Sequence, residues 1–285
     1  MRERPRISIV TPCYQAEHSI RETVASVLEQ TAILSGRAEL EYLIRDGGST
    51  DRTVPIIESF GSKRITIISE PDRGMYDALA KGLRQATGDI VAYLNAGDYY
   101  HKCAFDIVLD IFRNKQVKWL TGYQTLYNAS SQVVGFRIPF RYRRRLFARG
   151  LYGPRLGFVQ QESTFWAKEL LDAVDFDSLR RFRNSGDFYL WHQFAQKADL
   201  HIVAAYLGGF KVHPDSLTQK GAQEAGGAPA ANNIKEIREL AQRPGLPDYL
   251  VCAFDRLVGA LPLRVKKSLN PDQLFVWDKD REEWV

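Results

Sequence analysis

The chain has 285 residues, of which 45% are hydrophobic and 26% are charged, with a formal net charge of +5 at pH 7. This composition is typical of a soluble globular protein with one large domain, and the net charge is too small to name a partner. Three widely spaced cysteines argue against a disulfide framework or a zinc site and favour a reducing compartment, while no signal peptide and no apolar run of about 18 residues is found.

The first hundred residues alternate between predicted strands and helices. Strands are predicted at 6–10, 40–44, 65–69 and 90–94, and helices at 17–30, through 56–60 and at 75–86. This alternation predicts a parallel sheet with helices on both faces. Polar or glycine-rich residues follow every strand, and such ends on one edge of a sheet form a ligand site. The polar or glycine-rich segments after the strands begin at Thr11, Asp46, Glu70 and Asn95.

The pattern is less regular after residue 100. Strands are predicted at 119–127 and 133–138, where a hairpin is one arrangement, and helical pieces at 170–176 and 188–197. Residues 202–212 indicate either a strand pair or one long strand broken at Gly208. A small-residue linker at 221–232 is followed by an apolar helix at 249–261.

The segment 88–101 carries the strongest chemical signal. The apolar run Ile90–Leu94 ends in the sequence Asn95-Ala96-Gly97-Asp98. An acid beside a flexible glycine at the end of a strand suits a hard cation that carries a diphosphate, although an ordinary turn is the alternative. The chain contains neither G-x-G-x-x-G nor G-x-x-x-x-G-K-[ST], so a dinucleotide-type Rossmann site and a P-loop are not expected.

Four segments occur in an order and at spacings that resemble the family 2 inverting glycosyltransferases with the GT-A fold. They are SIVTPCY at 8–14, DGGSTDRT at 46–53, EPDRGMYDALAKG at 70–82 and LNAGD at 94–98. The resemblance implies an α/β fold with a mostly parallel central sheet flanked by helices. It further implies a nucleotide-sugar donor, a divalent cation, Mg²⁺ or Mn²⁺, and inversion at the anomeric carbon.

The resemblance also divides the chain. The GT-A domain would span 1–220, with a nucleotide-binding half at 1–100 and an acceptor half at 101–220. A linker and a C-terminal helical appendage would follow at 221–285.

On the donor side, the resemblance puts Thr11, Pro12 and Tyr14 beside the nucleoside, where Tyr14 would stack on the base. Asp46 would accept a hydrogen bond from the ring N–H of the base, because a carboxylate is an acceptor only. Arg45 stands where many relatives carry a second acid, so the identity of the base stays open, with UDP expected first.

Asp77 matches a donor-site position, but it also lies four residues before Lys81 on one helical face, where a surface ion pair is the alternative. Asn95 and Asp98 stand in place of the Asp-x-Asp metal motif of the family. Asp98 is the surviving acid and would bind the cation that bridges the diphosphate oxygens.

On the acceptor side, Asp187 matches the general base of the family, and its apolar neighbours would raise its pKa toward neutrality. Capping of a helix is the alternative role for Asp187, and Glu162 is the other acid near that region. His213 matches a late histidine that reaches the metal or the diphosphate, with Lys211 adding positive charge.

Between Ile111 and Gln161 the chain has no acidic residue, and arginines alternate with aromatic residues at 137–155. This basic segment would meet an anionic membrane surface, the diphosphate of a lipid-linked acceptor or a nucleic acid, or form a solvated loop. We favour the first two and expect no nucleic-acid partner.

The predicted activity is therefore glycosyl transfer to a saccharide or lipid-linked saccharide during surface polysaccharide synthesis. It would take place in the cytoplasm, on the inner face of the membrane, with self-association left open. A non-catalytic protein that binds sugar nucleotides or glycans is the alternative, because the metal motif is incomplete.

Overall fold

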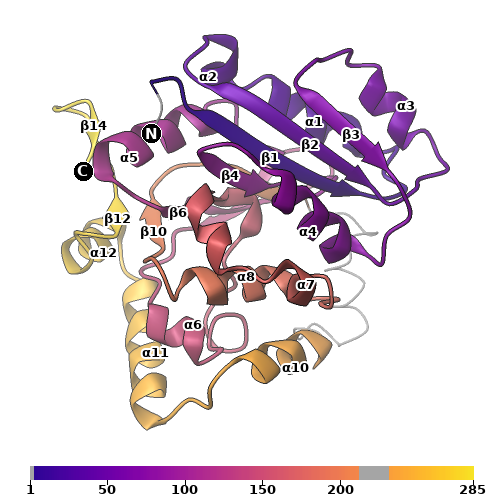
Figure 1. Ribbon diagram of the computed structural model, residues 1–285. Helices are drawn as coiled ribbons and strands as arrows, with labels where there is room; N and C mark the ends of the chain where they lie inside the picture. The colour runs from indigo at the N-terminus through magenta and orange to yellow at the C-terminus, as the bar shows by residue number, and fades with distance from the viewer. Residues whose placement is uncertain (1–2, 212–230) are drawn as a thin grey trace.

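The computed structural model describes residues 3–211 and 231–285 (Figure 1). Its strands are β1 (Arg6–Cys13), β2 (Glu39–Asp46), β3 (Ile65–Ser69), β4 (Ile90–Tyr93), β5 (Tyr99–Tyr100), β6 (Trp119–Thr121), β7 (Gln124–Tyr127), β8 (Val133–Arg137), β9 (Thr164–Ala167), β10 (His201–Val203), β11 (Gly208–Lys211), β12 (Leu274–Phe275), β13 (Trp277–Asp278) and β14 (Glu283–Trp284).

The α-helices are α1 (Ile20–Leu28), α2 (Thr31–Leu34), α3 (Thr53–Glu58), α4 (Met75–Gln85), α5 (Ala104–Lys115), α6 (Arg144–Ala148), α7 (Phe176–Leu179), α8 (Gly186–Phe194), α10 (Ala231–Leu240), α11 (Leu246–Gly259) and α12 (Leu263–Leu269). Short 3₁₀ helices lie at Gln161–Ser163 and Lys168–Ala173. Within the described ranges, none of the helices has the length and apolar character needed to cross a bilayer.

A large sheet with β1 near its centre organises the fold. In the described residues its eight strands have the order β12-β10-β6-β9-β4-β1-β2-β3. β1 pairs in parallel with β2 along its whole length and with β4 on its other side. Only β9 runs antiparallel to its neighbours among these described strands. The prediction of an α/β fold with a mostly parallel central sheet is confirmed.

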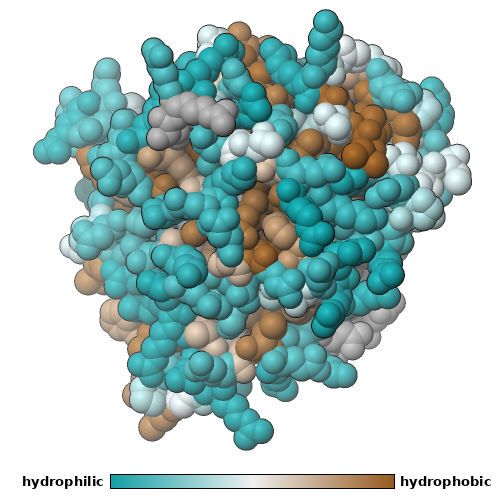
Figure 2. Space-filling view, viewed as in Figure 1, coloured by the Kyte–Doolittle hydropathy of each residue, from teal (hydrophilic) through white to brown (hydrophobic). Residues whose placement is uncertain are grey.

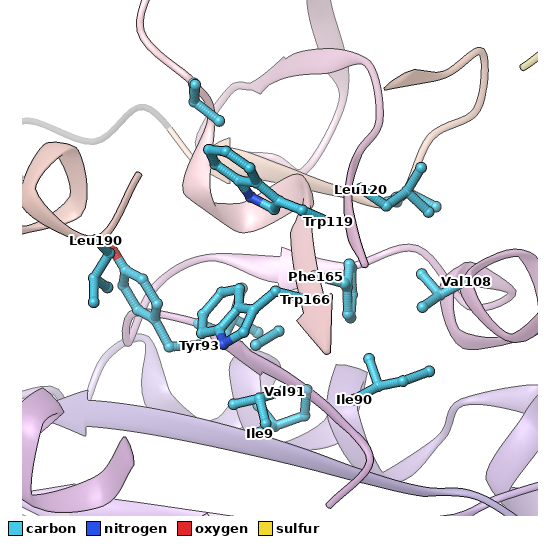
Figure 3. Packing of buried hydrophobic residues seen from close by; sticks show 14 of the residues in the cluster. Ile9, Ile90, Val91, Tyr93, Val108, Trp119, Leu120, Phe165, Trp166 and Leu190 are labelled. Atoms are coloured by element: carbon cyan, nitrogen blue, oxygen red, sulfur yellow. The ribbon is translucent and has the colours of Figure 1, made fainter. Parts of the chain in front are cut away.

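Helices cover both faces of this sheet, with α4 and α8 on one side and α1 and α3 on the other (Figure 1). The inner side of α8 is aromatic. Trp191 lies 5.7 Å from both Trp119 of β6 and Trp166 of β9, measured between ring centroids. Figure 3 shows Leu190 of the same helix beside Tyr93 of β4. Buried aromatic contacts therefore fix α8 against the middle of the sheet.

A smaller sheet, in the order β5-β11-β7-β8, continues from the end of β4. β5 begins directly after Asp98 and pairs antiparallel with β11. β7 and β8 form a hairpin, but the strand predicted at 119–127 divides into β6 of the large sheet and β7 of the smaller one. The segment 202–212, for which two arrangements were open, contains the separate strands β10 and β11 in different sheets.

The C-terminal segment contains the expected helices, but it is not only an appendage. β12 pairs in parallel with β10 and so adds a strand to the edge of the main sheet. This pairing joins the end of the described chain to the domain core. The predicted linker at 221–232 falls largely outside the described residues.

The basic segment is bonded to the C-terminal helices. Nε and Nη2 of Arg143 each donate to the Asp255 carboxylate at 2.8 Å. Arg145 donates to Asp248 at 2.6 Å, and Arg149 lies 3.6 Å from the same carboxylate. Both acids belong to α11 and are buried. We call Arg143, Arg145 and Arg149 the arginine clamp.

Two further arginines of the segment make contacts beside the clamp. Arg141 donates to the Oδ1 atom of Asn270, at the end of α12, at 2.8 Å. Arg144 points to α8, where it donates to the carbonyl oxygens of Ala195 at 2.5 Å and Gln196 at 2.6 Å. A cation at the C-terminal end of a helix is favourable because it meets the negative end of the helix dipole.

Substitution of Gly82 tests how closely α4 packs on β1. A Cβ atom at this position would lie 2.4 Å from Cγ1 of Val10. We expect Gly82→Ala to lower the free energy of unfolding by about 1–3 kcal/mol, because the crowded core must shift. Chemical denaturation measures this change.

Gly259→Ala is the matched control, because a Cβ atom there meets nothing within 4 Å. It should be neutral or stabilise the protein by up to about 1 kcal/mol, since alanine favours helix. Equal stability of the two variants would contradict the packing.

Candidate active site

The loop after β4 is held by α1. Thr23 Oγ1 accepts a hydrogen bond from the Gly97 N–H at 2.9 Å and donates one to the Asp98 carbonyl oxygen at 2.8 Å. Gly97 has a φ of 107°, a conformation that L side chains rarely adopt. Gly97 takes the place of the second acid of the Asp-x-Asp motif. Its backbone conformation gives a physical reason for a glycine at this position.

Asp98 and Glu162 form a buried pair of carboxyl groups. Asp98 is only 5% exposed, and its Oδ1 atom accepts a hydrogen bond from the Lys211 N–H at 3.1 Å. Its side chain is also hydrogen-bonded to that of Glu162. Burial and the neighbouring Glu162 raise the pKa of Asp98 well above its usual value, and burial raises the pKa of Glu162. The proximity of two buried carboxyl groups disfavours the ionisation of both at once.

Asp187 lies in the first turn of α8 and is half-buried. Its Oδ1 atom accepts a hydrogen bond from the Phe188 N–H at 2.7 Å and lies 3.5 Å from the Tyr76 hydroxyl. Burial, followed by the charge of Glu162, raises the pKa of Asp187 to about 6. The predicted shift toward neutrality is therefore present.

The three acids converge near the end of β4. Burial raises the pKa of Tyr93, the last residue of β4, and the charges of Asp187, Glu162 and Asp98 raise it further. All three carboxyl groups thus act on the same hydroxyl. The sequence predicted roles for Asp98 and Asp187, but it did not predict that Glu162 would join them.

The described residues contain no cluster of three His, Cys, Asp or Glu side chains that could hold a metal ion. However, the Oδ1 atom of Asn95 is buried without a hydrogen-bond partner, close in sequence to Asp98. Two oxygen donors fit a hard cation such as Mg²⁺ that completes its shell with phosphate and water oxygens. His213 lies outside the described residues, and its predicted contact with a metal stays a prediction.

Tyr14 follows β1 and is 63% exposed, as a stacking surface requires. A Cβ atom on Gly47 would lie 3.3 Å from Cδ2 of Tyr14 and 2.7 Å from Oδ2 of Asp72. Tyr14 and Asp72 therefore border the same small space. Sequence reasoning assigned no role to Asp72, although it is an acid among the polar residues after a strand.

The other residues predicted at the nucleoside lie deeper. Thr11 and Pro12 are buried, and Thr11 Oγ1 lies 3.1 Å from the Tyr42 hydroxyl. Asp46 is buried and accepts hydrogen bonds from the Ser49 N–H at 2.8 Å and the Ser69 hydroxyl at 2.6 Å. Asp46 thus orders the loop after β2, and its contact with a base stays a prediction.

Asp77 is buried on α4. It forms the expected ion pair with Lys81 at 3.5 Å, accepts a hydrogen bond from the Arg73 N–H at 3.1 Å and pairs with Arg180 beside α7. Burial alone would raise the pKa of Asp77, but these three partners lower it. The ion pair with Lys81 is confirmed, whereas a contact with the donor stays a prediction.

Comparison with known proteins now identifies the class and then the family. Solved glycosyltransferases share this architecture. The mannosyltransferase PcManGT from Pyrobaculum calidifontis, in complex with GDP-Man and Mn²⁺, has a TM-score of 0.55 at 18% identity, covering 94% of this chain and 79% of its own. TarS 1–349 of S. aureus with UDP-GlcNAc has a TM-score of 0.54 at 15% identity, covering 93% and 70%. The predicted GT-A fold is confirmed.

A sequence model described as Glycosyl transferase family 2 matches residues 8–150, half of the chain, and the protein belongs to this family. The Escherichia coli protein UDP-Glc:alpha-D-GlcNAc-diphosphoundecaprenol beta-1,3-glucosyltransferase WfgD is 26% identical over 233 residues, covering 81% of this chain and 82% of WfgD. Chondroitin synthase of Escherichia coli is 25% identical over 252 residues, covering 82% of this chain and 36% of the synthase.

Substitution of Thr23 tests whether its hydroxyl group holds the loop after β4. We expect Thr23→Val to lower the free energy of unfolding by about 1–3 kcal/mol, because the buried Gly97 N–H loses its acceptor. Thermal and chemical unfolding measure the loss. Thr23→Ser keeps the hydroxyl and should stay near the wild-type stability, so a valine variant as stable as the serine variant would contradict this role.

Proposed function

We propose that this glycosyltransferase moves a sugar from a nucleotide-sugar donor, expected to be a UDP-sugar, to a hydroxyl of a saccharide or lipid-linked saccharide, with inversion. The observation that carries the proposal is the buried carboxyl group of Asp98 after β4, with the carboxyl group of Asp187 at the start of α8 beside the Tyr76 hydroxyl. The name of WfgD, with its UDP-Glc donor and its diphosphoundecaprenol-linked acceptor, supports this donor and acceptor class.

Asp187 is the proposed general base. In an inverting transfer the acceptor oxygen attacks the anomeric carbon while the bond to the diphosphate oxygen breaks, and a base takes the hydroxyl proton. A carboxyl group with a pKa of about 6 is ionised at neutral pH yet basic enough to assist. The Tyr76 hydroxyl orients this carboxylate, and burial, followed by the charge of Glu162, keeps its pKa high.

Asp98 and Asn95 are the side chains that would hold Mg²⁺ or Mn²⁺. Such a cation neutralises charge on the leaving diphosphate. The complex of PcManGT with Mn²⁺ supports a divalent cation. At the other end of the donor, Tyr14 would stack on the base, while Asp72 or Asp46 would accept its ring N–H.

The reaction would take place in the cytoplasm, at the inner face of the membrane, during assembly of a surface polysaccharide. This placement is supported by the free cysteines Cys13, Cys103 and Cys252 and by the lipid-linked substrate in the name of WfgD.

Calorimetric titration of UDP, GDP and dTDP, with and without Mn²⁺, tests the donor site. We expect UDP to bind in a metal-dependent way and Asp98→Ala to remove that dependence, because the cation loses its carboxylate. Tyr14→Ala should weaken binding about tenfold with or without metal, since base stacking contributes roughly 1–3 kcal/mol.

Tyr14→Phe keeps an aromatic ring and is the matched control for the stacking variant. Failure of the wild-type protein to bind any of the three nucleotides would contradict the proposal. Metal-dependent binding without donor hydrolysis or transfer would instead favour a non-catalytic sugar-nucleotide-binding protein.

The pH dependence of kcat/KM tests the role of Asp187 as the general base. Below its pKa of about 6 the base is protonated, so kcat/KM should fall as the pH drops through that value. Asp187→Asn should reduce kcat by roughly 10²–10⁴-fold and leave UDP affinity unchanged, because the nucleotide does not need the base. Steady-state kinetics across the pH range measure both effects. An active asparagine variant that keeps the same acid limb would rule out this assignment.

A further inference from the structure

The amphipathic character of α11 is inverted relative to an ordinary surface helix. Its inward side carries Asp248 and Asp255, which are buried and bonded to the arginine clamp. Its outward side is apolar. A surface helix normally buries its apolar stripe and exposes its polar one. Here the ion pairs of Asp248 and Asp255, together with the buried side chains of Cys252 and Val258, hold the helix in place and leave the apolar stripe exposed.

The outward residues form a continuous pattern at helical spacing. Leu246, Leu250 and Leu257 are 72%, 63% and 72% exposed, which is unusual for three leucines of one helix. The pattern continues beyond the end of α11 and along α12. We call the whole set the apolar stripe: Leu246, Tyr249, Leu250, Phe254, Leu257, Leu261, Val265 and Leu269. Figure 2 shows hydrophobic surface at the lower left margin, over the position of α11.

The exposed charges on α11 and α12 themselves are basic, and the nearest exposed acid along the chain, Asp272, lies three residues after the end of α12. In the stretch 241–271, which is described throughout, Asp248 and Asp255 are the acids, and both are buried and paired. The exposed charges of this stretch are therefore basic, at Arg243, Arg256 and Arg264. Arg155, also exposed, lies over the ring of Tyr249 with its guanidinium carbon 5.9 Å from the centroid.

We propose that α11 and α12 dock on an anionic lipid surface, with the apolar stripe inserted among the acyl chains and the arginines at the headgroups. An in-plane helix with an apolar face and basic margins has the chemistry of an interfacial anchor. Phosphate headgroups supply the negative charges that the arginines lack in this part of the protein.

A second copy of the chain fits this surface less well. Two-fold association would place the same patch on both partners. Arg256 and Arg264 would then face a surface whose exposed charges are also basic, at a cost in repulsion. An anionic bilayer satisfies both the apolar and the basic side chains.

The docking surface is connected to the active site by α6. Arg143 and Arg145 bond to α11, while Arg144 between them bonds to the C-terminal end of α8. The other end of α8 carries Asp187. Membrane docking would thus hold the site at a set position relative to the lipid surface. Its use for a lipid-linked acceptor rests on the proposed function, whereas the docking itself does not.

Vesicle sedimentation tests the docking without any assay of activity. The full-length protein should bind vesicles of phosphatidylcholine mixed with phosphatidylglycerol and bind vesicles of phosphatidylcholine alone much less. Replacing Leu250 and Leu257 together by glutamate should weaken binding more than tenfold, because charged groups replace the inserted side chains. Arg256→Glu should weaken it at least fivefold, in line with the contribution of one surface cation.

Leu34→Glu is the matched control, because Leu34 on α2 is 64% exposed but lies outside the apolar stripe. It should bind vesicles as the wild type does. Equal thermal unfolding midpoints show that every variant is folded. Vesicle binding that survives Leu250→Glu/Leu257→Glu would overturn the proposal, as would no binding by the wild type. A concentration-dependent dimer that these substitutions dissociate, without vesicle binding, would assign the apolar stripe to a second copy.

Discussion

The parallel pairing of β1 between β2 and β4 determines where the polar groups of the site lie. Cys13 stands opposite Asp46, and Val10 stands opposite Tyr93. Strands that start at matched positions and run in the same direction end at one edge, so the loops after all three come together there. A shift of one residue in this register would turn the strand-end side chains to the other face. The donor site and the acidic cluster both depend on this pairing.

The pKa values of the buried acids of this protein shift in opposite directions, depending on the hydrogen-bond donors around each carboxyl group. Asp77 is buried among Arg180, Lys81 and a backbone N–H, and its pKa falls. Asp98 has one backbone donor and an acidic neighbour, and its pKa rises. The same residue type therefore serves as an ion-paired structural anion in one place and carries a raised pKa in another. The number of hydrogen-bond donors, more than depth alone, separates these roles.

The sequence predicted the first half of the fold because its strands and helices show clear local periodicity. It also singled out Asp98 and Asp187, whose roles in the site stay predictions. The insertion of β9 and the addition of β12 to the sheet were not predicted, because both depend on pairing between distant segments. The partnership of Asp77 with Arg180 was missed for the same reason. Nothing local revealed that Gly97 adopts a positive φ.

The basic segment shows that the charge pattern of a sequence does not by itself predict which groups the charges contact. Its arginines predicted an anionic membrane or a phosphate ligand, yet the arginine clamp is bonded to two acids about a hundred residues away in sequence. Those acids are separated by seven positions, or two helical turns, and so face the clamp together. Tyr249, Leu250 and Phe254, which lie between them in sequence, are thereby exposed, whereas Cys252 is buried with the two acids. The surface with membrane character lies on a different segment from the basic one.

The attachment of α11 also has a thermodynamic consequence. A helix held mainly through ion pairs, with its leucines in water, exposes less new apolar surface on detaching than a helix of the core does. The heat-capacity change of unfolding comes mostly from apolar exposure, so local opening of α11 should have a smaller one. Its free energy would vary more nearly linearly with temperature than that of the sheet. Since the desolvation penalty of ion pairs falls on warming, the pairing of α11 with the arginine clamp should weaken less steeply with temperature than its apolar contacts do.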